Sequence, residues 1–240
     1  MPCPYNFDIA DESPDARRLE LSLPSNSSLN PGIVFGGLRM ANRVEVECKR
    51  YFTDLRQIAA NLPYDSIDRI AEELLNGYES GHAVYVFGNG GSASLASHFA
   101  CDLNKGTSHC NGGKRFRVLA LTDNIPTITA WANDSSYEDI FAEQLKNFVQ
   151  PRDIAFAISC SGNSPNVLNA LAVAREANAL TIGITGFSGG KMKMLCDICA
   201  VVPSEDMQII EDLHLSMAHS IFRLVSSRIT HKSMAASSAR

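Results

Sequence analysis

The stretch AVYVFGNGGSASLASHFACDLNK, residues 83–105, organises the rest of this chain. It opens with an apolar run, residues 83–87, of the β-branched and aromatic kind that is typical of a strand buried on both faces. Residues 88–91, GNGG, then end the strand, because glycines allow positive φ and leave the backbone amides open to a ligand. The pattern predicts a helix over residues 93–103 with Ser92 as its N-cap.

The start of this predicted helix is a candidate anion site. The first amides of a helix lack intrahelical partners and lie at the positive end of the helix dipole, so they favour a phosphate. A plain strand–helix turn would have the same glycines. A dinucleotide fingerprint is disfavoured, because the spacing after Gly90 is wrong and no acidic residue ends the next strand. The candidate phosphate-binding residues here are Asn89, Gly90, Gly91 and Ser92.

A second polar loop follows the predicted strand at residues 154–159. Its serines supply hydroxyl groups, and Ser164 is expected to cap a helix that has Pro165 at its first position. Two such loops at neighbouring strand ends can converge on one phosphate, which favours phosphate binding over a plain turn. The candidate residues of this loop are Ser159, Cys160, Ser161 and Ser164.

Two pairs of polar residues on predicted helices are candidates for a metal site. His98 and Asp102 are four residues apart and share a helix face. Glu211 and His219 lie about 80° apart around the last predicted helix. Each pair could be an ordinary polar face, but facing each other they would form an N/O site for zinc or a similar divalent ion. His214 lies more than about 100° from His219, which indicates a structural role.

The composition is that of an ordinary globular protein. The 240 residues are 45% hydrophobic and 20% charged, which is sufficient for one domain with a sizeable core. A net charge of -5 without a cluster of lysine and arginine argues against nucleic-acid binding. No apolar run reaches the length of about 18 residues that crosses a bilayer, so we expect no membrane span.

The cysteines and the N-terminus indicate a reducing cytoplasm. Seven cysteines, an odd and scattered set, are not typical of a disulfide framework in a chain of this length. The pair Cys196 and Cys199 could be redox-active or bind zinc, but a single such pair favours two small buried side chains. The first 31 or so residues lack the apolar segment of a signal peptide.

The order of predicted elements defines the fold class. Strands alternate with helices, which predicts an α/β fold in which a five-stranded parallel sheet lies between two helical layers, with two helices before the first strand. We expect residues 1–38 to form a flexible extension, residues 39–230 one domain and residues 231–240 a frayed tail. The strands are predicted at residues 83–87, 116–121, 154–159, 180–185 and 198–202, the first two helices at 39–62 and 66–78, and the last at 207–229.

Four segments in this order resemble the sugar isomerase (SIS) domain, and within it the phosphoheptose isomerases. They are GNGGSASLASHFACDL, ISCSGNSPNVLNAL, ITGFSGGKM and VVPSEDMQIIEDLHLSMAH, and the likeness extends over residues 44–225. The resemblance implies a flavodoxin-like parallel sheet, a homotetramer with sites at subunit boundaries, and bound zinc. It implies conversion of D-sedoheptulose 7-phosphate to D-glycero-D-manno-heptose 7-phosphate.

The resemblance also implies roles for individual residues. Ser92, Ser159, Ser161 and Ser164 match phosphate-holding serines, while Cys160 replaces the usual threonine. Asp123 or Asn124 matches a substrate-binding aspartate. An arginine is common where this chain has Lys105 and Gly106.

Further positions match the catalytic and metal-binding residues of the family. Asp102 stands where a glutamate base is common, and His219 matches the acid–base partner. Glu211 stands where a glutamine is common and is expected to contact substrate or metal. The metal set implied for zinc is His98, Asp102, Glu211 and His219.

Two alternatives to this reaction remain open from the sequence. The chain could isomerise another ketose phosphate, or it could sense phosphosugars or bind a partner without turnover. A related branch that binds a replication initiator is similar over the glycine loop but lacks the histidine on the last helix. The presence of His219 together with Asp102 favours an enzyme.

Overall fold

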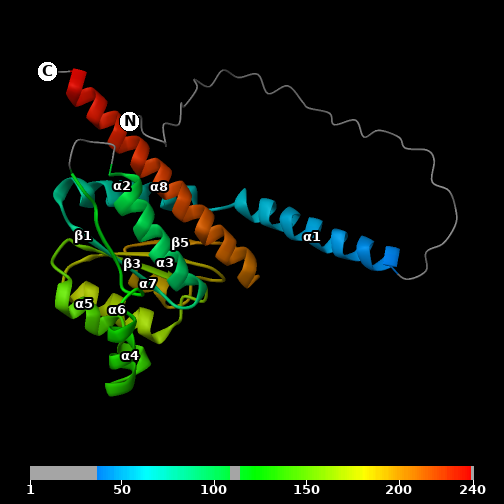
Figure 1. The fold of residues 1–240 in the computed structure, drawn as a ribbon, viewed down its shortest axis with the longest axis horizontal. Coiled ribbons are helices and arrows are strands. Elements are labelled where there is room, and N and C mark those ends of the chain that lie inside the picture. Colours follow the sequence, from blue (N-terminus) through cyan, green and yellow to red (C-terminus); the bar gives the residue numbers. More distant parts are fainter. Residues whose placement is uncertain (1–36, 109–113, 239–240) are drawn as a thin grey trace. The chain divides into compact units, whose positions relative to one another are not determined.

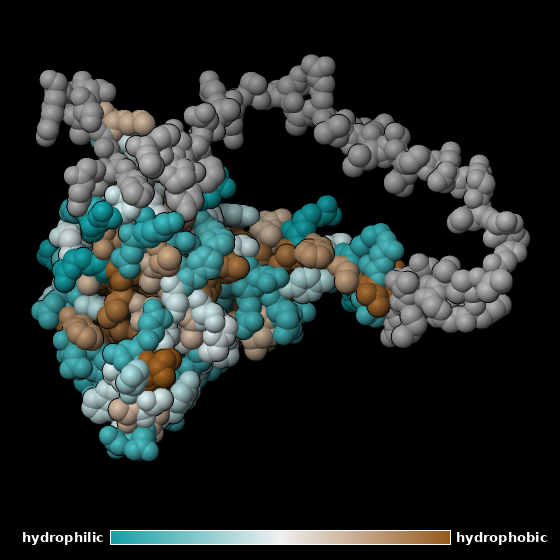
Figure 2. Space-filling model, in the orientation of Figure 1, coloured by the Kyte–Doolittle hydropathy of each residue, from teal (hydrophilic) through white to brown (hydrophobic). Residues whose placement is uncertain are grey.

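The structure is a computed structural model that describes residues 37–108 and 114–238. The chain divides into two units, residues 1–53 and 54–240. The described residues of the first unit, residues 37–53, all belong to helix α1 (Gly37–Ala59). The Val44, Val46 and Phe52 side chains of this helix are exposed. Hydrophobic residues accordingly show among the hydrophilic ones along α1 (Figure 2). Residues 1–36, nearly all of the predicted extension, lie outside the described residues.

The second unit is built on a five-stranded parallel sheet, as predicted. The continuous apolar runs form strands because both faces of the sheet are covered, and every residue of β1 and β3 is buried. The strand order is β2-β1-β3-β4-β5. The strands are β1 (Ala83–Gly88), β2 (Arg117–Ala120), β3 (Ile154–Ser159), β4 (Leu180–Thr185) and β5 (Ile198–Val201).

This strand order places a topological switch point between β1 and β3. The chain passes from β1 to β2 on one side and then returns to β3 on the other side of β1. Ligands of doubly wound sheets bind outside the carboxyl ends of the strands at such a point. Gly88 is in register with Ile158, so the glycine loop and the serine loop begin at nearly the same level.

Helices cover both faces of the sheet (Figure 1). One layer consists of α2 (Tyr64–Ser80), α3 (Gly91–Cys101) and α8 (Met207–Ser238). The other layer consists of α5 (Ala142–Phe148), α6 (Pro165–Glu176) and α7 (Met192–Leu195), with α4 (Ile125–Asp134) and the short 3-10 turn η2 (Tyr137–Asp139) beside them. The observed unit is therefore the predicted α/β/α sandwich.

The beginning of α3 differs from the sequence prediction. The helix starts at Gly91 and its N-cap is Gly90, which has a φ of 55°. The amides of Ala93 and Ser94 bond to the Gly90 carbonyl, so the turn closes before Ser92 is reached. The prediction of Ser92 as N-cap was wrong, and its side chain is instead buried inside the first helical turn.

The C-terminal ends of α3 and α8 also differ from the prediction. After Cys101, α3 passes into a π-helical turn, η1 (Asp102–Gly106), of the kind that often occurs at functional sites. Helix α8 continues through Ser238, so residues 231–238, predicted to fray, are helical. Lys232 pairs with Glu79 of α2, which holds this part of the helix.

None of the helices in the described ranges has the length and hydropathy needed to cross a bilayer. Cys48, Cys101, Cys160, Cys196 and Cys199 carry free thiols. Cys196 and Cys199 are partly buried and share a hydrogen bond, which raises the pKa of the Cys196 thiol and lowers that of Cys199.

Candidate active site

The glycine loop after β1 brings the start of α3 close to the sheet. A Cβ atom at Gly88 would lie 2.5 Å from the Ile158 carbonyl oxygen and 2.7 Å from the Ser92 Cβ. No side chain fits there, so the loop requires glycine for close packing. The N-terminus of α3 consequently lies at the carboxyl edge of the sheet, next to the loop that follows β3.

A pair of asparagines joins the two loops. Asn89 donates to Asn166 Oδ1 at 2.9 Å, and Asn166 donates back to Asn89 Oδ1 at 2.8 Å. Tyr137 donates to the same oxygen of Asn89 at 3.1 Å. The Asn89 side chain thus positions the loop, and the contact of Asn89 with phosphate stays a prediction. Asn166 and Tyr137 carry no local sequence pattern that predicts this role.

The serine loop presents hydroxyl groups that are not used to cap its helix. Ser164 is the N-cap residue of α6, yet its hydroxyl makes no cap bond and lies 3.3 Å from that of Ser159. The Ser161 hydroxyl accepts from the Asn163 amide at 3.2 Å. The hydroxyls of Ser159 and Ser164 therefore have capacity left for a ligand.

Cys160 and Ser92 connect the serine loop to α3. The Ser92 side chain lies within hydrogen-bonding reach of the Cys160 thiol. Burial raises the pKa of this thiol, and the negative charge of Glu211 raises it further. A thiol with a raised pKa stays protonated at neutral pH, so Cys160 acts here as a small polar wall and not as a nucleophile.

A cluster of His98, Asp102 and His219 lies beside these loops. The Nε2 atoms of the two histidines are 3.3 Å apart. Asp102 Oδ2 lies 3.6 Å from Nε2 of His98 and 3.8 Å from Nε2 of His219. The π-helical turn presents Asp102, and α8 supplies His219, so the cluster joins α3 and η1 to the last helix.

The geometry of this cluster fits a divalent metal ion such as zinc. One ligand atom from each of the three residues lies within 4.8 Å of the other two. Around a zinc ion with bonds of about 2.0–2.1 Å, tetrahedral ligand atoms lie about 3.4 Å apart, close to the distances seen here. Two imidazoles and a carboxylate with a fourth position open form a donor set typical of catalytic zinc.

Glu211 lies apart from the three-residue cluster, next to the glycine loop. Its Oε1 atom is 2.9 Å from the position that a Cβ of Gly91 would take. Gly91, Ser92, His98 and Glu211 all line one cavity of about 200 Å³. The structure therefore brings three of the four predicted metal ligands together and places the fourth beside the start of α3.

His214 lines the same cavity and is 1% exposed. Burial lowers the pKa of its imidazole to about 4, and contact with the Thr185 backbone offsets part of this shift. Neither ring nitrogen makes a well-aligned hydrogen bond with the described residues. His214 is therefore a neutral buried imidazole with unused hydrogen-bonding capacity.

The two candidates in the turn after β2 have different surroundings. The Asn124 side chain accepts from the Thr127 amide at 3.2 Å and caps α4. Asp123 instead accepts from Ser97, the residue before His98. The Asn124 side chain is thus used as a helix cap, whereas Asp123 contacts Ser97 of α3.

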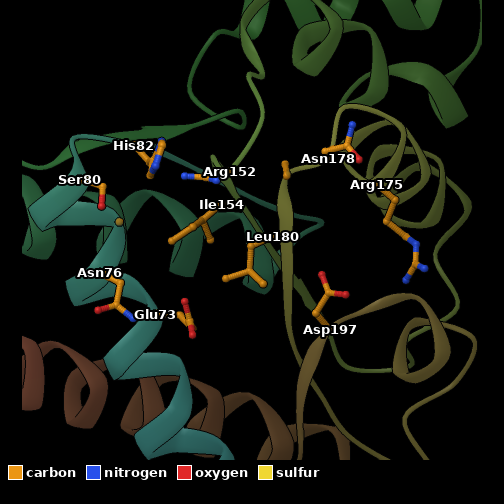
Figure 3. A pocket seen from close by; sticks show the side chains of 12 residues that line it. Glu73, Asn76, Ser80, His82, Arg152, Ile154, Arg175, Asn178, Leu180 and Asp197 are labelled. Carbon is orange, nitrogen blue, oxygen red and sulfur yellow. The ribbon is translucent and has the colours of Figure 1, made fainter.

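A larger cavity of about 560 Å³ lies at the opposite, amino-terminal ends of the strands (Figure 3). Its floor is apolar, with Ile154 and Leu180 at the centre of the view. Arg175 and Asp197 on its rim already have structural partners. Arg175 donates to the Leu195 carbonyl at 2.8 Å, and Asp197 accepts from Thr181 Oγ1 at 2.7 Å.

Comparison with known proteins agrees with the fold and the loops. Residues 50–186 match the SIS domain family. This match spans more than half of the chain, and the chain therefore belongs to the SIS domain family.

Within that family, the chain groups with the phosphoheptose isomerases. It is 39% identical over 170 residues to the phosphoheptose isomerase of Aliarcobacter butzleri, covering 70% of this chain and 87% of that relative. It is 36% identical over 181 residues to a probable phosphoheptose isomerase of Thermoplasma acidophilum, covering 75% and 98%. The solved phosphoheptose isomerase of Neisseria gonorrhoeae superposes with a TM-score of 0.71 at 27% identity, covering 78% of this chain and 99% of that one.

Proposed function

We propose that this protein is an aldose–ketose isomerase that converts D-sedoheptulose 7-phosphate to D-glycero-D-manno-heptose 7-phosphate. The observation that carries the proposal is the meeting of His98, Asp102 and His219 beside two phosphate-type loops. The names of the relatives at 36–39% identity support the same reaction.

The reaction moves a proton between C1 and C2 of the sugar through a cis-enediol. It requires a base that takes the proton from carbon and an acid that donates a proton to the carbonyl oxygen. We assign the base to Asp102 and the acid to His219. Asp102 Oδ2 faces both histidines, so the second carboxylate oxygen is left to take the proton. His219 lies 3.8 Å from Asp102, close enough for both to act on adjacent carbons.

The two loops would hold the phosphate end of the sugar. The hydroxyls of the serines and the amides at the start of α3 donate hydrogen bonds, and Cys160 forms the wall between them. Holding the phosphate fixes the reacting carbons relative to Asp102 and so contributes through orientation. The proposed binding residues are Asn89, Gly90, Gly91, Ser92, Asp123, Asn124, Ser159, Cys160, Ser161, Ser164 and Glu211, with Asp123 favoured over Asn124.

The proposed metal is zinc, with His98, Asp102, Glu211 and His219 as its ligands. A residue bound tightly to zinc is a poor proton carrier, so Asp102 and His219 act as base and acid only while they are released from the metal. Bound zinc would polarise a substrate oxygen as a Lewis acid. We further propose a homotetramer in the cytoplasm. The exposed Val44, Val46 and Phe52 of α1 support association, and the five free thiols within the described ranges support a reducing compartment.

Separate substitutions of the two catalytic candidates test the proposal. Asp102→Asn and His219→Ala should each lower the turnover of sedoheptulose 7-phosphate by about 10²–10⁴-fold. His231→Ala is the matched control, because it removes an exposed histidine from the same helix, and it should retain turnover. Zinc content per subunit, measured by atomic emission, should fall in His98→Ala and stay unchanged in His231→Ala.

A panel of ketose phosphates separates this proposal from its alternatives. Faster turnover of a shorter sugar phosphate would change the proposed substrate but not the proposed type of reaction. Absence of turnover by the zinc-loaded wild type, together with tight binding of the sugar phosphate, would favour a phosphosugar sensor.

A further inference from the structure

We propose that Glu211 couples cation binding to phosphoryl binding. In this proposal its carboxylate occupies the anion-binding end of α3 and leaves it when a divalent cation binds at the group formed by His98, Asp102 and His219. The inference rests on the proposed function, because it takes the two loops as the phosphoryl site.

The position of the carboxylate is the first support. Both Glu211 oxygens, at 2.9 and 3.3 Å, lie close to the place where a Cβ of Gly91 would be. Gly91 is the first residue of α3, an eleven-residue helix whose dipole is positive at this end. A carboxylate is stabilised at such a helix end in the same way as a phosphate.

The lack of other partners for this carboxylate is the second support. Within the described residues, the Glu211 side chain makes no hydrogen bond or ion pair. Its charge nevertheless reaches the serine loop, because it raises the pKa of the Cys160 thiol. The carboxylate therefore acts on both loops at once.

The third support is His214, a buried residue in the wall of the same cavity. His214, 1% exposed and without a well-aligned hydrogen bond, lines the same cavity as Glu211 and Ser92. An unsatisfied buried imidazole is costly unless a ligand or a rearrangement completes its hydrogen bonds. The cavity thus has unused hydrogen-bonding groups at His214 and a negative charge without an ion-pair partner at Glu211.

These features make the carboxylate and a phosphoryl group competitors. A phosphoryl group carries up to two negative charges, and like charges held in one small site repel each other. The exposed Glu211 side chain can swing away, since it has three rotatable bonds.

The three-residue cluster offers the alternative position. His98 lines the cavity together with Glu211, so the cluster and the glycine loop open onto the same space. A divalent cation held by one carboxylate and two imidazoles keeps positive charge and attracts a second carboxylate. By linkage, the cation must then strengthen phosphoryl binding as much as a phosphoryl group strengthens cation binding.

Calorimetric titration with inorganic phosphate tests this coupling. The protein is compared stripped of metal and loaded with one equivalent of zinc, with excess metal removed. For the wild type, zinc should tighten phosphate binding by at least about tenfold. In Glu211→Gln, the metal-free protein should bind phosphate at least about fivefold more tightly than the wild type, and zinc should add less than about threefold.

Glu205→Gln is the matched control, because it makes the same charge change at an exposed position before α8 and outside the cavity lining. It should behave as the wild type does. Equal metal-free affinities, or equal zinc effects, in the wild type and Glu211→Gln would overturn the coupling while leaving the phosphoryl site intact. Failure of every form to bind phosphate would overturn the phosphoryl site and the proposed function with it.

Discussion

The two ends of the parallel sheet differ in how their polar groups are used. At the carboxyl end, a cavity of about 200 Å³ is lined by His214, whose ring nitrogens lack hydrogen bonds, and the serine loop beyond β3 has hydroxyls with bonding capacity left. At the amino end, Arg175 and Asp197 of a cavity of about 560 Å³ already make hydrogen bonds that hold the structure together. The comparison teaches that unsatisfied, converging groups identify a site better than volume does.

Two aspartates show the structural use of the amino end. Buried Asp153 accepts from the amides of Ala83 at 2.8 Å and Gln150 at 2.9 Å, and so ties the start of β1 to the turn before β3. Asp197 accepts from the Thr181 amide at 2.9 Å at the start of β4. These carboxylates hold the first residues of β1 and β4 in place, whereas the glycine and serine loops follow the last residues of β1 and β3.

The largest expected effect on stability is at Asp153. Asp153→Ala would take this acceptor away from the buried amide of Ala83, the partly buried amide of Gln150 and the Tyr85 hydroxyl. At about 1–3 kcal/mol for a buried group, we expect a loss of about 4 kcal/mol in the free energy of unfolding. Asp153→Asn keeps an acceptor and should lose less. Urea unfolding measures both, and the turnover of the folded fraction should change by less than about twofold. A selective loss of turnover would contradict the structural role of this end.

Glycines at the two ends of β1 provide the next test of the difference between the ends of the sheet. Gly88→Ala at the carboxyl end of β1 would force its Cβ to within 2.5 Å of a backbone oxygen, so it should cost about 3 kcal/mol and abolish phosphate binding. Gly81→Ala, before β1, meets nothing within 4 Å and should cost only about 1 kcal/mol for its φ of 80°. Thermal unfolding and phosphate titration distinguish them. Equal effects would show that the loop tolerates a side chain.

The buried imidazole at the carboxyl end predicts a pH dependence. Because burial lowers the pKa of His214 from 6.5 to about 4, the unfolded chain binds more protons between these pH values. The free energy of unfolding should therefore fall as the pH drops from about 6.5 to 4, by up to about 3 kcal/mol. His214→Phe should flatten this slope in urea unfolding at pH 7, 6 and 5. An unchanged slope in the variant would mean that other groups cause it.

The smallest effect is expected at Arg152, on the rim of the larger cavity. Its φ of 73° is strained for a residue with a side chain, so Arg152→Gly should raise the free energy of unfolding by about 0.5 kcal/mol. Turnover of sedoheptulose 7-phosphate should stay within about twofold of the wild type. A tenfold loss would show that the amino end takes part in function after all.

The sequence by itself was sufficient for the sheet and its two loops. Continuous apolar runs identify buried parallel strands, and the glycines and serines follow directly after β1 and β3. Because parallel strands end at the same edge, the two loops could be expected to meet there. His98 and Asp102 share a face by their spacing alone, which local geometry fixes.

Only the tertiary structure decided how distant residues meet. Asn89 and Asn166 are 77 residues apart, and His98 and His219 are 121 apart, so no local pattern could pair their atoms. The position of Glu211 beside Gly91, and not in the cluster, likewise depends on how α8 packs against α3. Periodicity reports on contacts within a helix or strand, whereas the atoms of a site are placed by the packing of elements that the sequence keeps apart.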